Sequence, residues 1–210
     1  MSLLQENETL NIGIVIFDEV EVLDFCGPFE VFSVTSNSIA QQTKRKVGVF
    51  NVFTVAERDL LISTRGGMLV QPHYTINNYP HIDIVVVPGG FGTRKEIDNP
   101  VLMAWLAKVV QQTRLNTSVC TGSFLLGKVG ILEGHSATTH WASLDRFAQA
   151  FPNVRVQRKV RWVDDTVITS AGISAGIDMS LHVVERLLGR EQAEATAKQM
   201  EYVWQENARV

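Results

Sequence analysis

A buried strand that ends directly in a pair of glycines constrains the fold of this chain more than any other feature. Residues 82–87 read Ile-Asp-Ile-Val-Val-Val, and Pro-Gly-Gly follows at 88–90. A second strand followed by small residues occurs further along the chain. Thr-Ser-Val at 117–119 is followed by Cys120, then by small residues, and then by a predicted apolar helix at 124–127. Short β-branched strands that alternate with helices are typical of a mostly parallel sheet with helices on both faces.

Weaker signals place further elements in the same alternating order. Apolar runs predict strands at 10–17 and 47–55, and the amphipathic stretch 99–113 predicts a helix. Gly27 and Pro28 predict that the first long helix begins at this proline, because proline is favoured at the first helical position.

Turn residues complete the outline. Two short strands are expected within 60–70, a hairpin within 154–170, and a last helix over 190–204. We therefore predict an α/β, flavodoxin-like fold in which helices sandwich a mostly parallel sheet. The whole chain, 1–210, should form a single domain, with residues 1–9 as a flexible tail.

Cys120 lies where the predicted strand meets the helix, and Thr121, Gly122 and Ser123 follow it. Small residues permit the sharp turn that presents the serine of Gly-x-Ser-x-Gly hydrolases, here with cysteine in its place. The positive end of the helix dipole favours the nucleophilic thiolate. A buried, inert cysteine is the alternative, and composition alone favours it. A plain buried strand does not need these turn residues, so we predict a cysteine nucleophile elbow.

Asp24 is the second candidate site residue. It lies three residues ahead of Gly27, so simple N-capping does not account for it, and apolar and thiol side chains follow it. A carboxylate in such company is a candidate for a raised pKa. Ligands of parallel sheets bind beyond the carboxyl ends of the strands. The strands that end near Asp24, Gly89 and Cys120 should therefore meet at one pocket.

The composition excludes several classes of function. Of 210 residues, 45% are hydrophobic and 20% charged, which suits an ordinary globular protein. The net charge is −3, and the basic triplet at 44–46 is read as a solvated turn, so we expect no nucleic-acid partner. Residues 1–11 do not resemble a signal peptide, and no apolar run nears the roughly 20 residues that span a bilayer. Two cysteines suit a reducing compartment, so we expect a cytoplasmic protein without membrane contact.

We also expect neither a metal nor a cofactor. His73 and His81 lie in a polar loop without acidic or cysteine neighbours, which makes a metal site improbable. The glycine-rich loop lacks both Gly-x-Gly-x-x-Gly and Gly-Lys-Ser/Thr, so its phosphate-binding signal is weak. Instead, Gly89 and Gly90 are expected to let the backbone approach a ligand and point N–H groups at it.

Five motifs together resemble the ThiJ/PfpI superfamily, also described as class I glutamine amidotransferase-like. They are Asp-Phe-Cys-Gly-Pro-Phe-Glu-Val at 24–31, Val-Pro-Gly-Gly at 87–90, Val-Cys-Thr-Gly-Ser at 119–123, Ala-Thr-Thr-His-Trp at 137–141 and Ala-Gly-Ile-Ser-Ala-Gly-Ile-Asp at 171–178. The motifs occur in the family's order over nearly the whole chain. Within the superfamily they are most similar to isocyanide hydratase and to the ligand-like domain of certain AraC-type regulators.

The resemblance implies a reaction. Cys120 would attack the terminal carbon of an isocyanide to give a thioimidate, and Asp24 would supply or accept the proton and position water. Hydrolysis would then release an N-substituted formamide. We expect Asp24 and Cys120 to titrate as a coupled pair that carries one proton near neutral pH, because two like charges that close seldom coexist.

The resemblance also suggests supporting residues. The amides of Gly89, Gly90 and Thr121 are candidates to hold developing negative charge. His140, with Thr139 beside it, is placed at the pocket edge or at a dimer interface. Cys26, next to this region, could resolve an oxidised Cys120 in a redox switch, but an inert thiol is the favoured interpretation.

Departures from the family pattern leave alternatives open. Thr121 stands where protease-like members carry histidine, so we expect no peptidase, and the same residue counts against glyoxalase-like activity on α-oxoaldehydes. A non-enzymatic redox or small-ligand sensor that uses Cys120 is the third possibility. AraC-type regulators add a helix-turn-helix module for which these 210 residues leave no room, so DNA binding is not expected. The resemblance implies a homodimer, for which we expect exposed apolar residues near Phe25 and Phe29.

Overall fold

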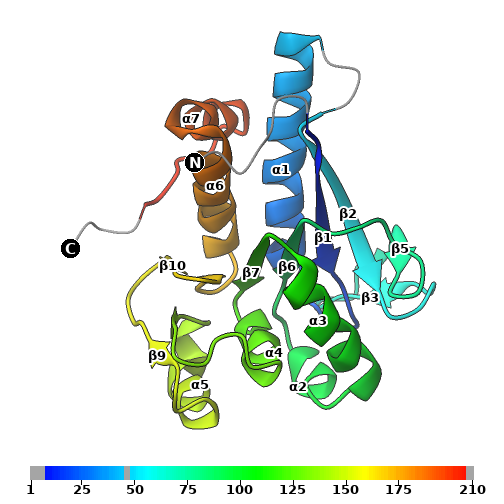
Figure 1. The fold of residues 1–210 in the computed structure, drawn as a ribbon, viewed down its shortest axis with the longest axis vertical. Coiled ribbons are helices and arrows are strands. Elements are labelled where there is room, and N and C mark those ends of the chain that lie inside the picture. The colour runs from blue at the N-terminus through cyan, green and yellow to red at the C-terminus, as the bar shows by residue number, and fades with distance from the viewer. Residues whose placement is uncertain (1–7, 45–47, 207–210) are drawn as a thin grey trace.

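A seven-stranded sheet forms the centre of the molecule in this computed structural model, which describes residues 8–44 and 48–206 (Figure 1). All neighbouring strands are parallel except β10 and β11, which form an antiparallel hairpin at one edge. The strands, in their order across the sheet, are β10 (Trp162–Asp164), β11 (Ile168–Ser170), β7 (Leu115–Val119), β6 (Ile84–Val87), β1 (Leu10–Val15), β2 (Phe50–Ala56) and β5 (Tyr74–Thr75).

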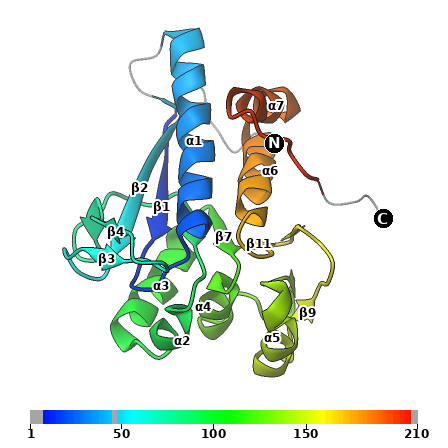
Figure 2. The same ribbon diagram turned by 180° about the vertical axis from the view of Figure 1, so that it is seen from behind.

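Helices connect the strands and cover both faces of the sheet. Figures 1 and 2 show α1 and α6 side by side on one face, with α7 against them, and α3 on the opposite face. The helices are α1 (Val22–Thr43), α2 (Thr93–Glu96), α3 (Pro100–Gln112), α4 (Gly122–Lys128), α5 (Leu144–Ala150), α6 (Ala175–Leu188) and α7 (Arg190–Gln199). A 3₁₀ turn, Trp141–Ser143, precedes α5.

Two small strand pairs lie outside the main sheet. β3 (Ile62–Ser63) and β4 (Leu69–Val70) form an antiparallel hairpin, as the turn residues predicted. β8 (Ser136–Ala137) pairs in parallel with β9 (Arg155–Val156). The predicted hairpin within 154–170 is therefore shorter than expected, because only β10 and β11 belong to it.

The α/β, flavodoxin-like fold predicted from the alternating pattern is confirmed. All four residues of β6 are buried, as expected for a central strand covered on both faces. Asn99 caps α3 by accepting from the N–H groups of Val101 and Leu102, so this helix begins where the sequence pattern placed it. The carboxyl ends of β1, β6 and β7 lie at the same edge of the sheet because their register is parallel.

Two helix boundaries were predicted wrongly. α1 begins at Val22, six residues before Pro28, and the proline lies inside the helix. Proline cannot donate to the carbonyl four residues earlier, and its ring crowds that carbonyl, but the helix continues through Pro28. Asp24 therefore belongs to the first helical turn. The last helix, α7, ends at Gln199 rather than at Trp204.

Two predictions fall wholly or mainly outside the described residues. The flexible tail was placed at 1–9, of which only residues 8 and 9 are described, and residues 45 and 46 of the basic triplet are likewise outside. Within the described ranges, no helix has the length and hydropathy needed to span a bilayer.

Candidate active site

The turn between β7 and α4 holds Cys120 in a backbone conformation that few non-glycine residues adopt. Its φ angle is +56°, in the left-handed region. The N–H of Cys120 lies 3.2 and 3.1 Å from the carbonyl oxygens of Ser170 and Ala171. The hydroxyls of Thr139 and Ser123 donate to the Cys120 carbonyl oxygen at 2.9 and 3.2 Å. Thr139, predicted at the pocket edge, is thus buried and supports the strained turn.

Asp24 faces this turn from the first turn of α1. Its side chain is fully buried, and Oδ2 accepts the N–H of Gly89 at 3.0 Å. The carboxyl group lies near enough to the Cys120 thiol for each group to affect the pKa of the other, while Oδ1 is buried without a hydrogen-bond partner among the described residues. The structure therefore brings together Gly89 and Cys120, which follow the carboxyl ends of β6 and β7, and Asp24 from the helix that follows β1.

Burial changes the proton affinity of both groups. It raises the pKa of Asp24 to about 7, although the hydrogen bond from Gly89 lowers that pKa. It also raises the pKa of Cys120 to about 12, and the negative charge of Asp24 raises it further. Since the carboxyl group titrates far below the thiol, the proton that the pair keeps above pH 7 resides on sulfur.

The sequence-based expectation that the helix dipole favours the Cys120 thiolate is wrong for this closed site. A helix N-terminus stabilises a charge by roughly 0.3–1 kcal/mol, less than the roughly 1.4 kcal/mol of one pKa unit. Desolvation of a buried group can shift its pKa by about 3–5 units. Burial was invisible in the sequence pattern, and it outweighs the dipole at Cys120.

The glycine pair after β6 lies against both groups, but its amides are already used. The N–H of Gly89 binds Asp24, and the N–H of Gly90 donates to the Thr121 hydroxyl oxygen at 3.1 Å. A Cβ on Gly89 would lie 2.5 Å from the Thr121 nitrogen and 2.9 Å from Asp24 Oδ2. Hence neither glycine amide is free to hold a developing charge, contrary to prediction. The Thr121 N–H, which interacts with the Cys120 sulfur, is the remaining predicted donor.

A loop ahead of α6 closes the site from the other side, and the sequence reading did not identify its role. Ile173 has a φ angle of +53°, which is exceptional for a β-branched residue, and its N–H interacts with the Asp24 carboxyl group. Gly172 lies so close to the His140 ring that a Cβ would be 2.1 Å from Cδ2. His140 Nδ1 accepts the Ala142 N–H at 3.3 Å. His140 is therefore half-buried behind the loop, with Nδ1 engaged in a turn.

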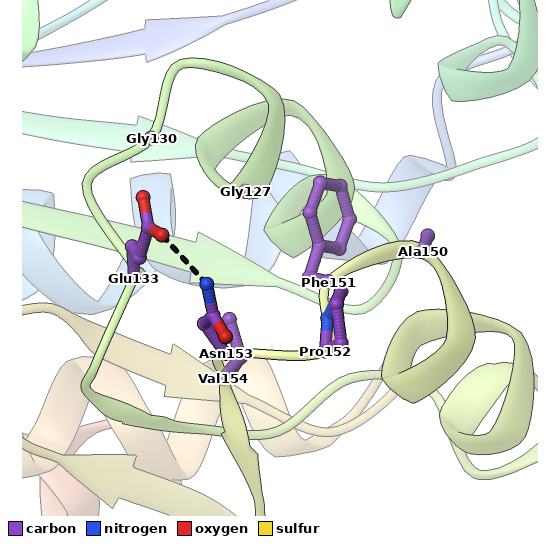
Figure 3. Close-up of a pocket in the computed structure, with 8 residues that line it drawn as sticks. All are labelled: Gly127, Gly130, Glu133, Ala150, Phe151, Pro152, Asn153 and Val154. Atoms are coloured by element: carbon purple, nitrogen blue, oxygen red, sulfur yellow. Dashed lines mark hydrogen bonds between the residues drawn. The ribbon is translucent and has the colours of Figure 1, made fainter.

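Access to the thiol is narrow. Cys120 is 6% exposed, so the predicted nucleophile elbow presents very little of its thiol to solvent. A cavity of about 150 Å³ lies elsewhere, between the far ends of α4 and α5 (Figure 3). Gly127, Phe151 and the hydrogen-bonded pair Glu133–Asn153 contribute to its lining. A ligand that reaches Cys120 must therefore be small or must displace a covering loop.

Other expectations have mixed outcomes. Of the exposed apolar residues predicted near Phe25 and Phe29, Leu23 is 36% exposed, whereas Phe25 itself is 4% exposed. The half-buried Phe29 stacks on His73 with 6.0 Å between ring centroids. Cys26 is half-buried, and burial raises the pKa of its thiol. No group of three or more His, Cys, Asp or Glu side chains in the described part of the chain is arranged to hold a metal ion.

Sequence comparisons find relatives of several kinds, among them an enzyme and a transcriptional regulator. It is 33% identical over 194 residues to the isonitrile hydratase of Pseudomonas putida, an alignment that covers 92% of this chain and 78% of the relative. It is 27% identical to the HTH-type transcriptional regulator GbdR of Pseudomonas aeruginosa. That alignment covers 94% of this chain and 52% of the regulator, so the chain spans about half of the regulator's length.

Solved structures share the fold. A ThiJ/PfpI family protein from Pseudomonas syringae superposes with a TM-score of 0.81 at 27% identity, covering 92% of this chain and 75% of that one. Drosophila melanogaster DJ-1beta superposes with a TM-score of 0.77 at 18% identity, covering 93% of this chain and all of that one. The model of the DJ-1/PfpI family matches residues 11–186. The chain therefore belongs to the DJ-1/PfpI family.

Proposed function

We propose that this protein is a cysteine-dependent hydratase that converts an isocyanide (isonitrile) into an N-substituted formamide. The observation that carries the proposal is the proximity of a buried thiol to a buried carboxyl group whose pKa lies near 7, since each group affects the pKa of the other. Such a carboxyl group can both accept and return a proton near neutral pH, as general acid–base catalysis requires. The similarity to the isonitrile hydratase of Pseudomonas putida supports the choice of substrate class.

The first step forms a carbon–sulfur bond. The ionised Asp24 removes the proton of the Cys120 thiol as the sulfur attacks the terminal carbon of the isocyanide. This step avoids a free thiolate, whose formation burial disfavours. Asp24 then returns the proton to the attacked carbon, which gives a neutral thioimidate, R–N=CH–S–Cys120, and an ionised carboxylate.

The second step consumes water. Asp24 removes a proton from a water molecule that adds to the thioimidate carbon, and it passes that proton to the imine nitrogen. Collapse of the tetrahedral intermediate breaks the carbon–sulfur bond, releases R–NH–CHO and returns the proton to Cys120. The balance is one isocyanide plus one water to one formamide. The Thr121 N–H lies at the sulfur, where it can stabilise negative charge during attack and departure.

Substrate shape supports an isocyanide over a bulkier electrophile. The terminal –N≡C group is linear and carries no side group at the reacting carbon, so it suits a thiol that is 6% exposed. An α-oxoaldehyde would present a trigonal carbon with an oxygen that needs a donor, yet the Gly89 and Gly90 amides are engaged.

The test is turnover of an aryl isocyanide, followed as formamide by chromatography. We expect turnover by the wild-type protein and none by Cys120→Ala, with Cys120→Ser as the variant that replaces the thiol by a hydroxyl group of similar size. Consumption of methylglyoxal without isocyanide turnover would instead assign the glyoxalase-like activity.

A small-ligand or redox sensor is the second candidate function. It is favoured by the alignment of nearly the whole chain with about half of a transcriptional regulator. It also fits a cysteine kept closed by two strained residues, Cys120 and Ile173. Absence of both enzymatic activities, together with ready formation of Cys120 sulfenic acid in mild peroxide, would support this reading.

A further inference from the structure

Residues 171–178, the covering segment, comprise the loop ahead of α6 and the first turn of that helix, and they touch the cysteine turn directly. The carbonyl oxygen of Ala171 accepts the N–H of Cys120 at 3.1 Å. The start of α6 packs on the end of β7, because a Cβ on Gly176 would lie 2.9 Å from Val119 Cγ1. The position of the covering segment therefore affects the geometry of the turn that carries the thiol.

Arg161 links the covering segment to the edge of the sheet. It directly precedes β10, which lies beside α6 (Figure 1). Its Nε donates to Asp178 Oδ2 at 2.8 Å, and its Nη2 donates to the same oxygen and, at 3.3 Å, to the Ser174 hydroxyl. The Arg161 carbonyl oxygen accepts the N–H of Ala171 at 2.9 Å. One arginine thus contacts the covering segment at its start, its middle and its end.

The carboxylate that holds Arg161 is itself fixed in place. Asp178 is fully buried, and a buried carboxylate needs a charged partner to offset its lost hydration. Its second oxygen, Oδ1, accepts the N–H of Gln205 at 2.9 Å, and Trp204 Nε1 donates to the Asp178 carbonyl oxygen at 3.2 Å. Asp178 therefore anchors the guanidinium group, and the remaining contact of Nη2 fixes Ser174 relative to that anchor.

We propose that Arg161 is a positioning residue of the candidate active site, which holds the covering segment over Cys120 through its side-chain contacts with Ser174 and Asp178. Loss of the Ser174 contact frees the middle of the segment, so the Ala171 carbonyl leaves the Cys120 N–H more often. The inference rests on the proposed function for its effect on turnover, but not for its effect on access to the thiol.

The test compares Arg161→Lys with wild type in the full chain. Lysine keeps the charge that balances Asp178, but its single ammonium group lacks the planar fork that reaches both Asp178 and Ser174. The first measurement is the rate at which iodoacetamide alkylates Cys120, followed by mass spectrometry of the peptide that contains this cysteine. A closed thiol reacts when its cover opens. Because the variant loses a hydrogen bond from a charged donor, we expect alkylation to be about tenfold faster.

The second measurement is turnover of an aryl isocyanide. In Arg161→Lys we expect kcat to fall about tenfold, by the same loss of a charged hydrogen bond, while KM changes little. The covering segment positions the thiol and not the substrate, so its displacement affects the chemical step. A general loss of stability would not divide the effect between kcat and KM in this way.

Arg186→Lys is the matched control. Arg186 also joins α6 to the β10 hairpin, since it donates to Asp164 at 2.7 Å, but it lies near the other end of the helix. It should leave alkylation and turnover as in wild type. Ser174→Ala removes only the second contact of Arg161, so it tests the proposal even where Arg161→Lys fails to fold, which circular dichroism would show. The double variant should be alkylated no faster than Arg161→Lys alone, because both changes break the same contact.

Two results would overturn the proposal. One is wild-type alkylation of Cys120 in folded Arg161→Lys, or in Ser174→Ala where the lysine variant does not fold. The other is an equal acceleration in Arg186→Lys. Wild-type protein without isocyanide turnover would remove the proposed function, and the alkylation rates would still decide whether Arg161 holds the covering segment in place.

Discussion

At the scale of single residues, the candidate site depends on two titratable groups, Asp24 and Cys120. Their buried environment stabilises neither anion. Asp24 has no exposed surface and Cys120 is 6% exposed, so each loses the hydration that would stabilise its anion. Each anion would also raise the pKa of the other group, because like charges that share a site disfavour a second ionisation. The lower pKa belongs to the carboxyl group, which makes Asp24 the base and Cys120 the proton donor in the resting protein.

The pH dependence of the rate should show that Asp24 acts as the base and Cys120 as the proton donor. If ionised Asp24 activates the thiol, kcat/KM for an aryl isocyanide rises with pH through about 7 and then stays level until the thiol itself ionises near 12. Asp24→Asn should remove the rise near pH 7 and lower kcat/KM by roughly 10²-fold or more, the usual effect of losing a general base. The measurement is initial-rate kinetics from pH 5 to 9. An unchanged rise in Asp24→Asn would exclude the assignment.

The same shift predicts an effect on stability. The pKa of Asp24 is about 7 in the folded protein against 3.8 for an unperturbed aspartate. Between these values the unfolded chain releases this proton and the folded chain retains it, so this group lowers stability as pH rises from about 4 to 7. Three pKa units correspond to roughly 4 kcal/mol as an upper bound. Urea unfolding at pH 5 and pH 8 should show a smaller loss in Asp24→Asn than in wild type. Equal losses would show that Asp24 ionises without penalty.

At the scale of elements, the strand-to-helix turn at Cys120 depends on a hydroxyl from another segment. Thr139→Val removes the hydrogen bond to the Cys120 carbonyl, which measures 2.9 Å, with little change in side-chain shape. Thr138→Val is a matched control, because the Thr138 hydroxyl donates to the Gln157 carbonyl at the same distance. Each change should lower the unfolding free energy by about 1 kcal/mol. Only Thr139→Val should lower kcat/KM, and equal kinetics in the two variants would refute a role in holding the turn.

The loop after β6 should be equally sensitive at Gly89. Alanine there would place its Cβ 2.5 Å from the Thr121 nitrogen and 2.9 Å from Asp24 Oδ2, so backbone or carboxyl group must move. We expect Gly89→Ala to abolish most activity and to weaken the Asp24 contact, measured as a shift of the pH–rate midpoint toward higher pH. Gly127→Ala, whose Cβ would meet the Phe151 ring at 2.8 Å far from Cys120, should affect stability alone. Normal kinetics in Gly89→Ala would show that the loop adapts.

The success of sequence reasoning differs between these elements for physical reasons. The β6 strand and the α3 helix could be predicted because local signals, a β-branched run and an Asn-Pro cap, agree with the tertiary structure. The start of α1 could not be predicted, because a proline at a tolerated interior position looks like a helix start. The Ile173 contact with Asp24 depends on a left-handed conformation that only tertiary packing can impose on isoleucine.

At the scale of the whole molecule, convergence of strand ends was predictable, but burial was not. Parallel strands bring their carboxyl ends to one edge, which is why Asp24, Gly89 and Cys120 meet although they are far apart in the chain. How deeply a side chain lies depends on every segment that covers it, and no local pattern encodes that. The expected thiolate at Cys120 was wrong for this reason.

The surface of the whole molecule bears on the proposed homodimer. Phe25 is buried, but Leu69 in the β3–β4 hairpin and Leu60 and Leu61, which directly precede β3, are 62%, 59% and 55% exposed. This hairpin is fixed to the body of the protein, because the Arg65 N–H donates to the Val20 carbonyl at 2.8 Å. Clustered apolar side chains on a fixed element are typical of a protein interface. The loop that carries Val20 leads into α1, whose first turn contains Asp24.

Size-exclusion chromatography with light scattering should therefore give twice the mass of one chain for wild type. Leu69→Glu, which would bury a charge at the interface, should give the mass of a monomer at the same concentration because an unpaired buried charge strongly opposes association. Val203→Glu changes a residue that is 81% exposed away from the hairpin and should remain dimeric. A monomeric wild-type protein, or a dimer that survives Leu69→Glu, would place the interface elsewhere or remove it. Activity measured on the monomeric variant then shows whether one chain alone completes the site around Cys120.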